Sequence, residues 1–231
     1  MRRVWLHGWA SSPEIWTLLP RTKDDHKINL SQQNASREFA TFADMCWQQL
    51  KITEPLNLVA WSFGGLISLA WLARYPQWVR SVTFIASTPY FVGKDQWPGI
   101  ERQRLDTLNH TLTLSPEEAV KNFWWELAQQ ESSSKHCFKF LMTTQQGDQR
   151  WLLHSLQWLA TEDYREVATQ YADRCHWILG QHDPIVPISL ESKLPGKVSV
   201  LNAGHCPMVS CPEELYAIIE GGANASSSPI I

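Results

Sequence analysis

The sequence has little net charge and no regular cysteine spacing, and each absence excludes classes of protein. Its 231 residues carry 20 lysines and arginines against 23 aspartates and glutamates, which gives a formal net charge of -3. This balance gives no general reason to expect nucleic acid or an anionic membrane as a partner. The five cysteines are scattered, odd in number and outside any CxxC spacing. They are typical of reduced thiols in a cytoplasmic protein rather than of a disulfide framework.

Signals for export, membrane insertion and metal binding are also missing. The apolar run near the N-terminus covers only residues 4–6, which is too short for a signal peptide. Residues 56–73 carry no charge, but paired glycines, an asparagine and two serines argue against a membrane span. His205 stands beside Cys206, yet no third and fourth ligand keeps a plausible metal-site spacing. We therefore expect a cytoplasmic protein with no metal and no other cofactor.

The charge-free stretch instead predicts a strand, a tight turn and a helix. Residues 56–61 form a short apolar run bounded by Pro55 and the glycines, as in a fully buried strand. From residue 65 to residue 74, leucines and alanines recur at helical spacing. Ser62 lies on the turn between them, where its hydroxyl projects outward beside the first amides of the helix. This arrangement predicts the nucleophile elbow of an α/β-hydrolase.

The rest of the chain alternates strand and helix patterns around one long helical segment. Strands are predicted at 3–6, 27–30, 79–86, 175–179 and 198–201, and helices at 37–50, at 212–219 and from about residue 13. This alternation predicts a mostly parallel sheet flanked by helices, the α/β-hydrolase fold. The helical segment predicts a lid over the carboxyl edge of the sheet. We divide the chain into a core (1–86 and 173–220), a helical lid (87–172) and a disordered tail (221–231).

Two loops offer the partners that a serine nucleophile needs. In this fold an acid and then a histidine follow the serine, on loops after later strands. Asp183 comes just after the strand at 175–179, and His205 just after the strand at 198–201. A neutral imidazole can take the serine proton, and a buried carboxylate can orient the imidazole. We therefore predict a catalytic triad of Ser62, Asp183 and His205.

Each of these signals alone also has an ordinary explanation. The A-x-S-x-G pattern occurs by chance in many chains, and Ala60 replaces its usual first glycine. Asp183 alone is equally typical of a solvated turn, and His205 of a loop. Their order along the chain and their places at strand ends favour the triad. The oxyanion of the reaction needs fixed donors, which we assign to the backbone amides of Trp9 and Phe63.

Three stretches resemble a specific family. LHGWASSPEIW (6–16), LVAWSFGGLISLAWLARYPQWVRSVTFIASTPYF (58–91) and DQWPGIE (95–101) are similar to the pimeloyl-[acyl-carrier-protein] methyl ester esterases of biotin synthesis. The resemblance covers roughly residues 4–219 and is strongest before residue 100. It implies a serine hydrolase that removes the methyl cap from a pimeloyl thioester on acyl carrier protein. It also implies the same triad and the same oxyanion amides, and a lid inserted after the family's sixth core strand.

The resemblance further implies substrate contacts in and near the lid. Trp97, Phe123, Trp124 and Trp125 are candidates for walls around the acyl chain, which needs a concave apolar channel. Trp9 is a further candidate for substrate binding. Lys135 and Lys139 coincide with two of the arginines by which the family holds its acidic carrier. They are four residues apart and so share one helical face.

The chain departs from the family in three places. The strands that usually precede residues 3–6 are absent, so the N-terminal part of the sheet is expected to be trimmed. Residues 29–36 replace a glycine-rich family stretch, and Glu118 and Asn122 stand where the family has further lid arginines. The lid as a whole is not basic, and a solvated helix face is an equal interpretation of the two lysines.

We expect a carboxylesterase that works through an acyl-enzyme on Ser62, with no nucleic acid or membrane as partner. Another hydrolase or lyase on the same fold remains open, such as a small-ester esterase, a thioesterase or a menaquinone-pathway lyase, since fold and triad do not determine the substrate. A non-catalytic ligand-binding module is the other alternative. His7 is interpreted as a structural histidine rather than a second base.

Overall fold

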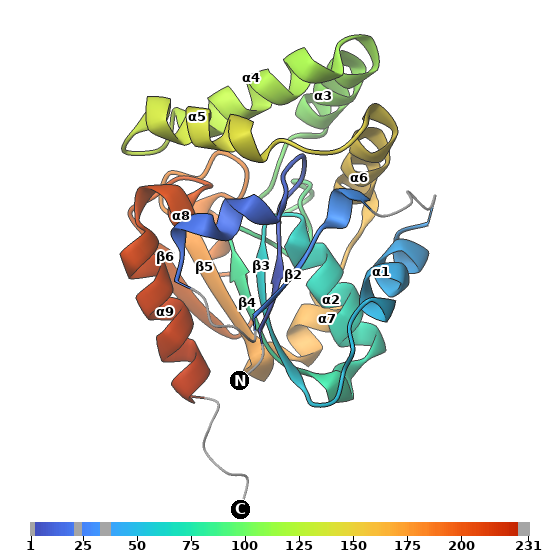
Figure 1. The fold of residues 1–231 in the computed structure, drawn as a ribbon, viewed down its shortest axis with the longest axis vertical. Coiled ribbons are helices and arrows are strands. Elements are labelled where there is room, and N and C mark those ends of the chain that lie inside the picture. Colours follow the sequence, from blue (N-terminus) through green and yellow to red (C-terminus); the bar gives the residue numbers. More distant parts are fainter. Residues whose placement is uncertain (1–2, 21–24, 33–37, 226–231) are drawn as a thin grey trace, which may run out of the picture.

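A parallel sheet of six strands forms the centre of the protein (Figure 1). The computed structural model describes residues 3–20, 25–32 and 38–225. The strand order is β2-β1-β3-β4-β5-β6, and every neighbouring pair runs parallel. The expected sheet is therefore confirmed. The strands are β1 (Arg3–Leu6), β2 (His26–Ile28), β3 (Leu56–Trp61), β4 (Val79–Ile85), β5 (Cys175–Gly180) and β6 (Lys197–Leu201).

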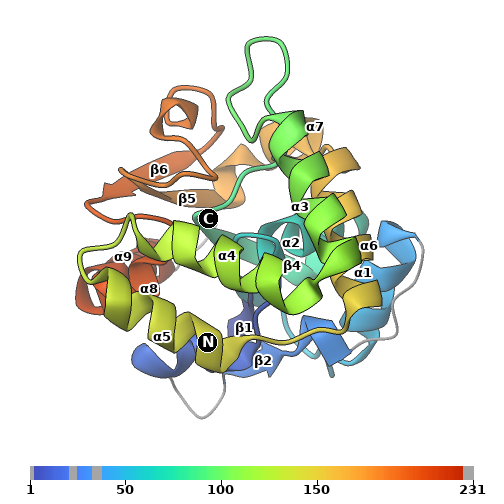
Figure 2. The ribbon, with the colours of Figure 1, turned by 90° about the horizontal axis from the view of Figure 1, so that it is seen from above.

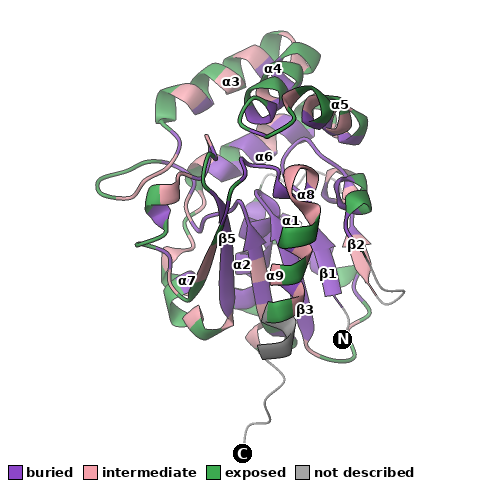
Figure 3. Cartoon of the chain, turned by 90° about the vertical axis from the view of Figure 1, so that its left-hand side faces the viewer, coloured by how far each residue is buried: buried purple, intermediate pink, exposed green. Residues whose placement is uncertain are grey.

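Helices cover both faces of this sheet. On one face α2 (Gly64–Arg74) contacts β1, β3 and β4, with α1 (Phe39–Gln48) and α7 (Arg165–Gln170) packed against it. On the other side lie α8 (Pro207–Ser210) and α9 (Pro212–Ala225), as Figure 1 shows. Strands β1, β3 and β5 are buried along their whole length, as expected for strands covered on both faces (Figure 3).

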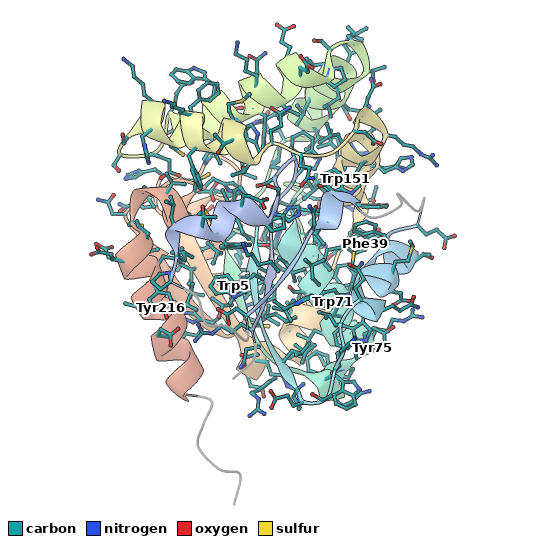
Figure 4. The ribbon with its side chains drawn as sticks, in the orientation of Figure 1. Trp5, Phe39, Trp71, Tyr75, Trp151 and Tyr216 are labelled. Atoms are coloured by element: carbon teal, nitrogen blue, oxygen red, sulfur yellow. The ribbon has the colours of Figure 1, made fainter. Side chains whose placement is uncertain are left out.

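Tryptophans provide much of the interior. Seven of the thirteen are among the largest fully buried side chains. Phe39, Trp71 and Tyr75 lie where α1 meets α2 (Figure 4). The Trp71 indole donates to the carbonyl of Ala43 at 2.8 Å, and the Tyr75 hydroxyl donates to Asp44 at 2.9 Å. These contacts combine a large buried area with a satisfied polar atom.

Four further helices lie above the carboxyl edge of the sheet. They are α3 (Arg102–Leu114), α4 (Pro116–Ala128), α5 (Ser134–Thr144) and α6 (Gln149–Thr161). Seen from above, α3, α4 and α5 cross over the strand ends (Figure 2). Their bonds to the core reach loops that follow strands: Arg104 donates to the carbonyl of Pro184, and the amide of Gln146 donates to that of Ala10. Helix α7 differs, because it packs against α2 within the core layer although it belongs to the predicted lid range.

Several predicted boundaries were wrong. Strand β2 ends at Ile28, because the amide of Leu30 donates to His7 rather than to the sheet. The helix near Pro13 is a 3-10 helix, and Ser12, its N-cap residue, makes no side-chain capping bond. Helix α9 continues to Ala225, so residues 221–225 are not a disordered tail: the buried Leu215 and Ile219 anchor the helix, and backbone bonds extend it. Some predictions fall partly outside the described residues: the stretch 29–36 and the helix 37–50 at residues 33–37, and the tail at residues 226–231. Among those described, no helix is both long and apolar enough to cross a membrane.

Candidate active site

Ser62 occupies a strained turn between β3 and α2. Its φ of 52° lies in the left-handed region, which residues with a side chain rarely adopt. The end of β4 holds this turn, since the Ser62 amide donates to Ile85 at 3.0 Å and the Ser87 hydroxyl donates to the Ser62 carbonyl at 2.8 Å. A Cβ at Gly64 would come within 2.6 Å of the Leu6 carbonyl oxygen, so only glycine lets the helix begin this close to β1.

The structure brings Ser62, His205 and Asp183 together in one line. His205 Nε2 lies 2.9 Å from Ser62 Oγ, and His205 Nδ1 lies 2.8 Å from Asp183 Oδ2. A carboxylate can only accept, so Nδ1 donates to it and Nε2 of the neutral ring accepts from the serine hydroxyl. All three residues are buried, with exposed fractions of 7%, 1% and 7%. The predicted triad residues thus have the separations that a nucleophile, a base and an orienting acid require.

Neighbouring strands place the two partner loops. Asp183 follows β5 and His205 follows β6, which pair in register up to Gly180 and Leu201. The loops are bonded to each other beyond that point, where the amide of His182 donates to the carbonyl of Ala203 at 2.9 Å. The second carboxylate oxygen of Asp183 accepts from the amides of Ile185 at 2.8 Å and Val186 at 3.0 Å. These two bonds orient the carboxylate so that its other oxygen faces the imidazole.

The turn after β1 lies directly against the serine. A Cβ at Gly8 would come within 2.8 Å of the Trp61 ring and 3.2 Å of the Ser62 Cβ. The backbone N–H of Trp9 follows in this turn, and that of Phe63 follows the serine itself. Both residues are buried, and across the described part of the chain neither N–H donates to another protein group. Two free buried donors beside a serine hydroxyl suit a developing negative charge.

His7 has a structural role next to this turn. Its Nδ1 donates to the Gly8 carbonyl at 2.8 Å, and its Nε2 accepts from the Leu30 amide at 2.9 Å. Complete burial lowers the pKa of His7 to about 4, since desolvation disfavours the imidazolium. The ring is therefore neutral at pH 7, and it connects the ends of β1 and β2.

Aromatic side chains from α4 lie above the site. Phe123 packs edge-on against Trp9, with ring centroids 5.0 Å apart, and Trp124 stacks near Trp61 at 6.1 Å. Phe123 also lines a cavity of about 480 Å³ between α3 and α4. Ile185 lines the same cavity, and its amide donates to the Asp183 carboxylate. The cavity therefore borders residues that contact Trp9 and Asp183.

Other predicted substrate residues lie elsewhere. The Trp97 indole donates to the Tyr90 carbonyl at 2.9 Å, and its ring packs on the Arg165 guanidinium, beside a surface hollow formed with α7. Trp125 is 42% exposed and packs against Phe138, because successive residues of α4 point about 100° apart. Trp97 and Trp125 are thus not brought to Ser62. Lys135 and Lys139 are exposed on α5, away from the three clustered residues.

Three residues that touch the site were not predicted. The Trp61 indole donates to the His205 carbonyl at 2.8 Å. Arg104 of α3 donates to the Pro184 carbonyl at 2.9 Å, next to the acid. Glu131, in the connection between α4 and α5, accepts from the amides on both sides of His205. The tryptophan beside the serine was a visible signal, whereas Arg104 and Glu131 stand in polar stretches that are typical of solvated helices.

Within the described ranges, no three histidine, cysteine or acidic side chains are grouped so that they could hold a metal ion. Cys206 is fully buried beside His205, and burial raises the pKa of its thiol. All five cysteines fall in the described ranges, and all are free thiols.

Comparison with known proteins places these features in context. The family model of the alpha/beta hydrolase family matches residues 4–218. A pimeloyl-[acyl-carrier protein] methyl ester esterase of Photorhabdus laumondii is 27% identical, covering 94% of this chain and 89% of that protein. One from Serratia marcescens is 28% identical, covering 94% and 91%. Among solved structures, an esterase from Exiguobacterium antarcticum superposes with a TM-score of 0.76 at 18% identity, covering 99% of this chain and 92% of the other. The expected fold is confirmed.

Proposed function

This chain belongs to the alpha/beta hydrolase family, and we propose that it is a serine carboxylesterase that removes the methyl ester from a pimeloyl chain on acyl carrier protein. Carboxylic ester hydrolysis follows from the family and from the esterase names of the relatives. The observation that carries the serine chemistry is the pair of hydrogen bonds from Ser62 through His205 to Asp183, at 2.9 and 2.8 Å. The names of the relatives supply the proposed substrate.

In the proposed reaction, Ser62 Oγ attacks the ester carbonyl while His205 Nε2 takes its proton. Asp183 stabilises the imidazolium that forms and keeps its Nδ1–H in place. The negative oxygen of the tetrahedral intermediate accepts from the amides of Trp9 and Phe63, and loss of one such donor typically costs about 10²–10³-fold in rate. His205 then gives the proton to the leaving methoxide, which departs as methanol. Water attacks the acyl-enzyme by the reverse sequence and releases the pimeloyl carboxylate, still joined to its carrier by the thioester.

The acyl chain is proposed to lie between α3 and α4. The cavity of about 480 Å³ is within the range of small-molecule sites. Phe123 lines it and also contacts Trp9, whose amide is one of the proposed oxyanion donors. Its wall also contains Leu105, Leu108 and Ile185, which suit a methylene chain. Ser62 itself is only 7% exposed. A carrier-bound ester therefore reaches the hydroxyl only when side chains above it move, and for this reason we assign α3–α6 as a lid.

The carrier is proposed to dock on the outer face of α5. Lys135 and Lys139 are both exposed there and lie one helical turn apart. An acidic carrier would gain long-range attraction from two such charges, chiefly in its association rate and at low salt. This substrate would place the enzyme in the cytoplasm.

The decisive experiment is mass spectrometry of methyl pimeloyl-acyl carrier protein after incubation with the enzyme. Methyl ester hydrolysis replaces the ester methyl group with hydrogen, so the attached group loses the mass of one CH₂ and stays on the carrier, whereas a thioesterase would release the whole acyl group. The Ser62→Ala variant should give neither product, and Ser192→Ala, which alters an exposed serine, should match the wild type. An intact carrier substrate alongside rapid hydrolysis of short aryl esters would instead indicate a small-ester esterase.

A further inference from the structure

One buried carboxylate has no part in the proposed reaction. Glu131 is 5% exposed, and among the described residues it and Asp183 are the two acidic residues that are buried. It lies in the connection between α4 and α5, far along the chain from the loop it touches. Its Oε1 accepts from the Cys206 amide at 2.6 Å, and its Oε2 accepts from the Gly204 amide at 3.1 Å.

These two bonds bracket the histidine. The amides belong to the residues immediately before and after His205, so one carboxylate holds the backbone of the loop on both sides of the histidine. A third bond acts between them, because the Trp61 indole donates to the His205 carbonyl at 2.8 Å. Hydrogen bonds to an ionised carboxylate are stronger than neutral ones, and a buried carboxylate is stable only when such donors surround it.

The contact leaves little freedom for the loop. A Cβ at Gly204 would come within 2.7 Å of Glu131 Oε1, so the carboxylate fits closely against the backbone of the loop. The imidazole projects from the segment that Glu131 holds, and its Nε2 is 2.9 Å from Ser62 Oγ. A displacement of about 1 Å in a reacting group can cost about 10²-fold in rate. The position of Glu131 therefore bears directly on the hydrogen bond to the serine.

We propose that Glu131 is a positioning residue that holds the His205 imidazole in line with Ser62. The reactivity of Ser62 then depends on the contact between the α4–α5 connection and the loop after β6. The proposal rests on the proposed role of His205 as base. With Glu131 in this role, the helices above the sheet help to set the geometry of the triad as well as covering it. When Glu131 leaves the loop, the two amides lose their acceptor and the imidazole loses its fixed place.

The test uses the full chain with Glu131→Ala and Glu131→Gln, and Glu117→Gln as a control that removes the same charge from an exposed position of α4. The measurements are the rate constant for inactivation by a fluorophosphonate, kcat and KM for a short aryl ester, and the folded fraction by thermal unfolding. Per folded molecule, Glu131→Ala should lower kcat and the inactivation rate by about 10²-fold with KM changed less than about threefold. Glu131→Gln keeps one acceptor oxygen and should fall between the alanine variant and the wild type.

The outcomes separate this proposal from the proposed function. If Glu131→Ala melts at a lower temperature but keeps the wild-type kcat per folded molecule, the residue is merely structural and the positioning role is refuted. If Glu131→Ala lowers kcat for the aryl ester and the inactivation rate as expected, but the wild type does not hydrolyse methyl pimeloyl carrier, the positioning role is supported and the proposed substrate is refuted. A wild-type enzyme that the fluorophosphonate does not label would overturn both.

Discussion

Replacing Asp183 with asparagine should disable the histidine without disturbing the loop. In the wild type, Asp183 Oδ1 accepts from the amides of Ile185 and Val186, while Oδ2 accepts from His205. Asparagine has one acceptor oxygen and one NH₂ group. The two backbone donors require the oxygen, so the NH₂ group must face His205 Nδ1. The imidazole then has to carry its proton on Nε2, where it can no longer accept from the Ser62 hydroxyl.

The magnitude follows from this change of tautomer. Holding the wrong tautomer in a serine triad costs about 10⁴-fold in kcat, or about 5.4 kcal/mol in the activation free energy. The loop keeps both amide bonds, so the melting temperature should stay within a few degrees of the wild type. Stopped-flow hydrolysis of an aryl ester measures the rate, and Asp173→Asn, an exposed position, controls for the loss of one charge. A kcat within tenfold of the wild type in a folded Asp183→Asn variant would refute the tautomer argument.

Three further predictions concern stability, docking and the thiols. The folded-state pKa of His7 near 4 lies below its unfolded value of 6.5, so its contribution is full above pH 6.5 and declines toward pH 4. Urea unfolding should show a loss of up to about 3 kcal/mol from this group, and His7→Gln should flatten the pH dependence. Lys135→Glu with Lys139→Glu should raise KM for the carrier-bound ester and leave aryl ester kinetics unchanged, while Lys193→Glu should change neither; an unchanged carrier KM would refute docking on α5. Four of the five thiols are buried and Cys211 is half-buried, and burial also raises the pKa of Cys211, so a disulfide reagent should react first with Cys211 and with the others only when the chain is unfolded. Rapid reaction of two or more thiols in the native enzyme would contradict this.

Local patterns predicted the elements closest to the serine. The apolar run and the glycines gave the bounds of β3 as observed and those of α2 to within one residue. Both signals are short-range: a buried strand needs continuous apolar residues, and the close approach at Gly64 excludes a side chain. The places of Asp183 and His205 were also visible, because carboxyl ends of parallel strands share one edge of the sheet.

Contacts between distant segments were not visible in the sequence. Glu131 stands in a run of glutamines and serines that is typical of a solvent-exposed segment. It is nevertheless buried, because a loop 73 residues away supplies the donors for its carboxylate. Trp97 lies in a motif that resembles the esterase family, but its indole packs on Arg165 of α7 rather than at the serine. Both placements depend on contacts between segments that are distant along the chain, and helical periodicity carries no information on such contacts.

The role of Ser62 as the nucleophile that His205 activates can be tested on the intact enzyme. The most direct measurement is peptide mass spectrometry of the enzyme after reaction with a fluorophosphonate. We predict one phosphonyl adduct per chain, on the peptide that contains Ser62, and no adduct in the Ser62→Ala variant. An adduct on another residue, or equal labelling of the Ser62→Ala variant, would contradict it.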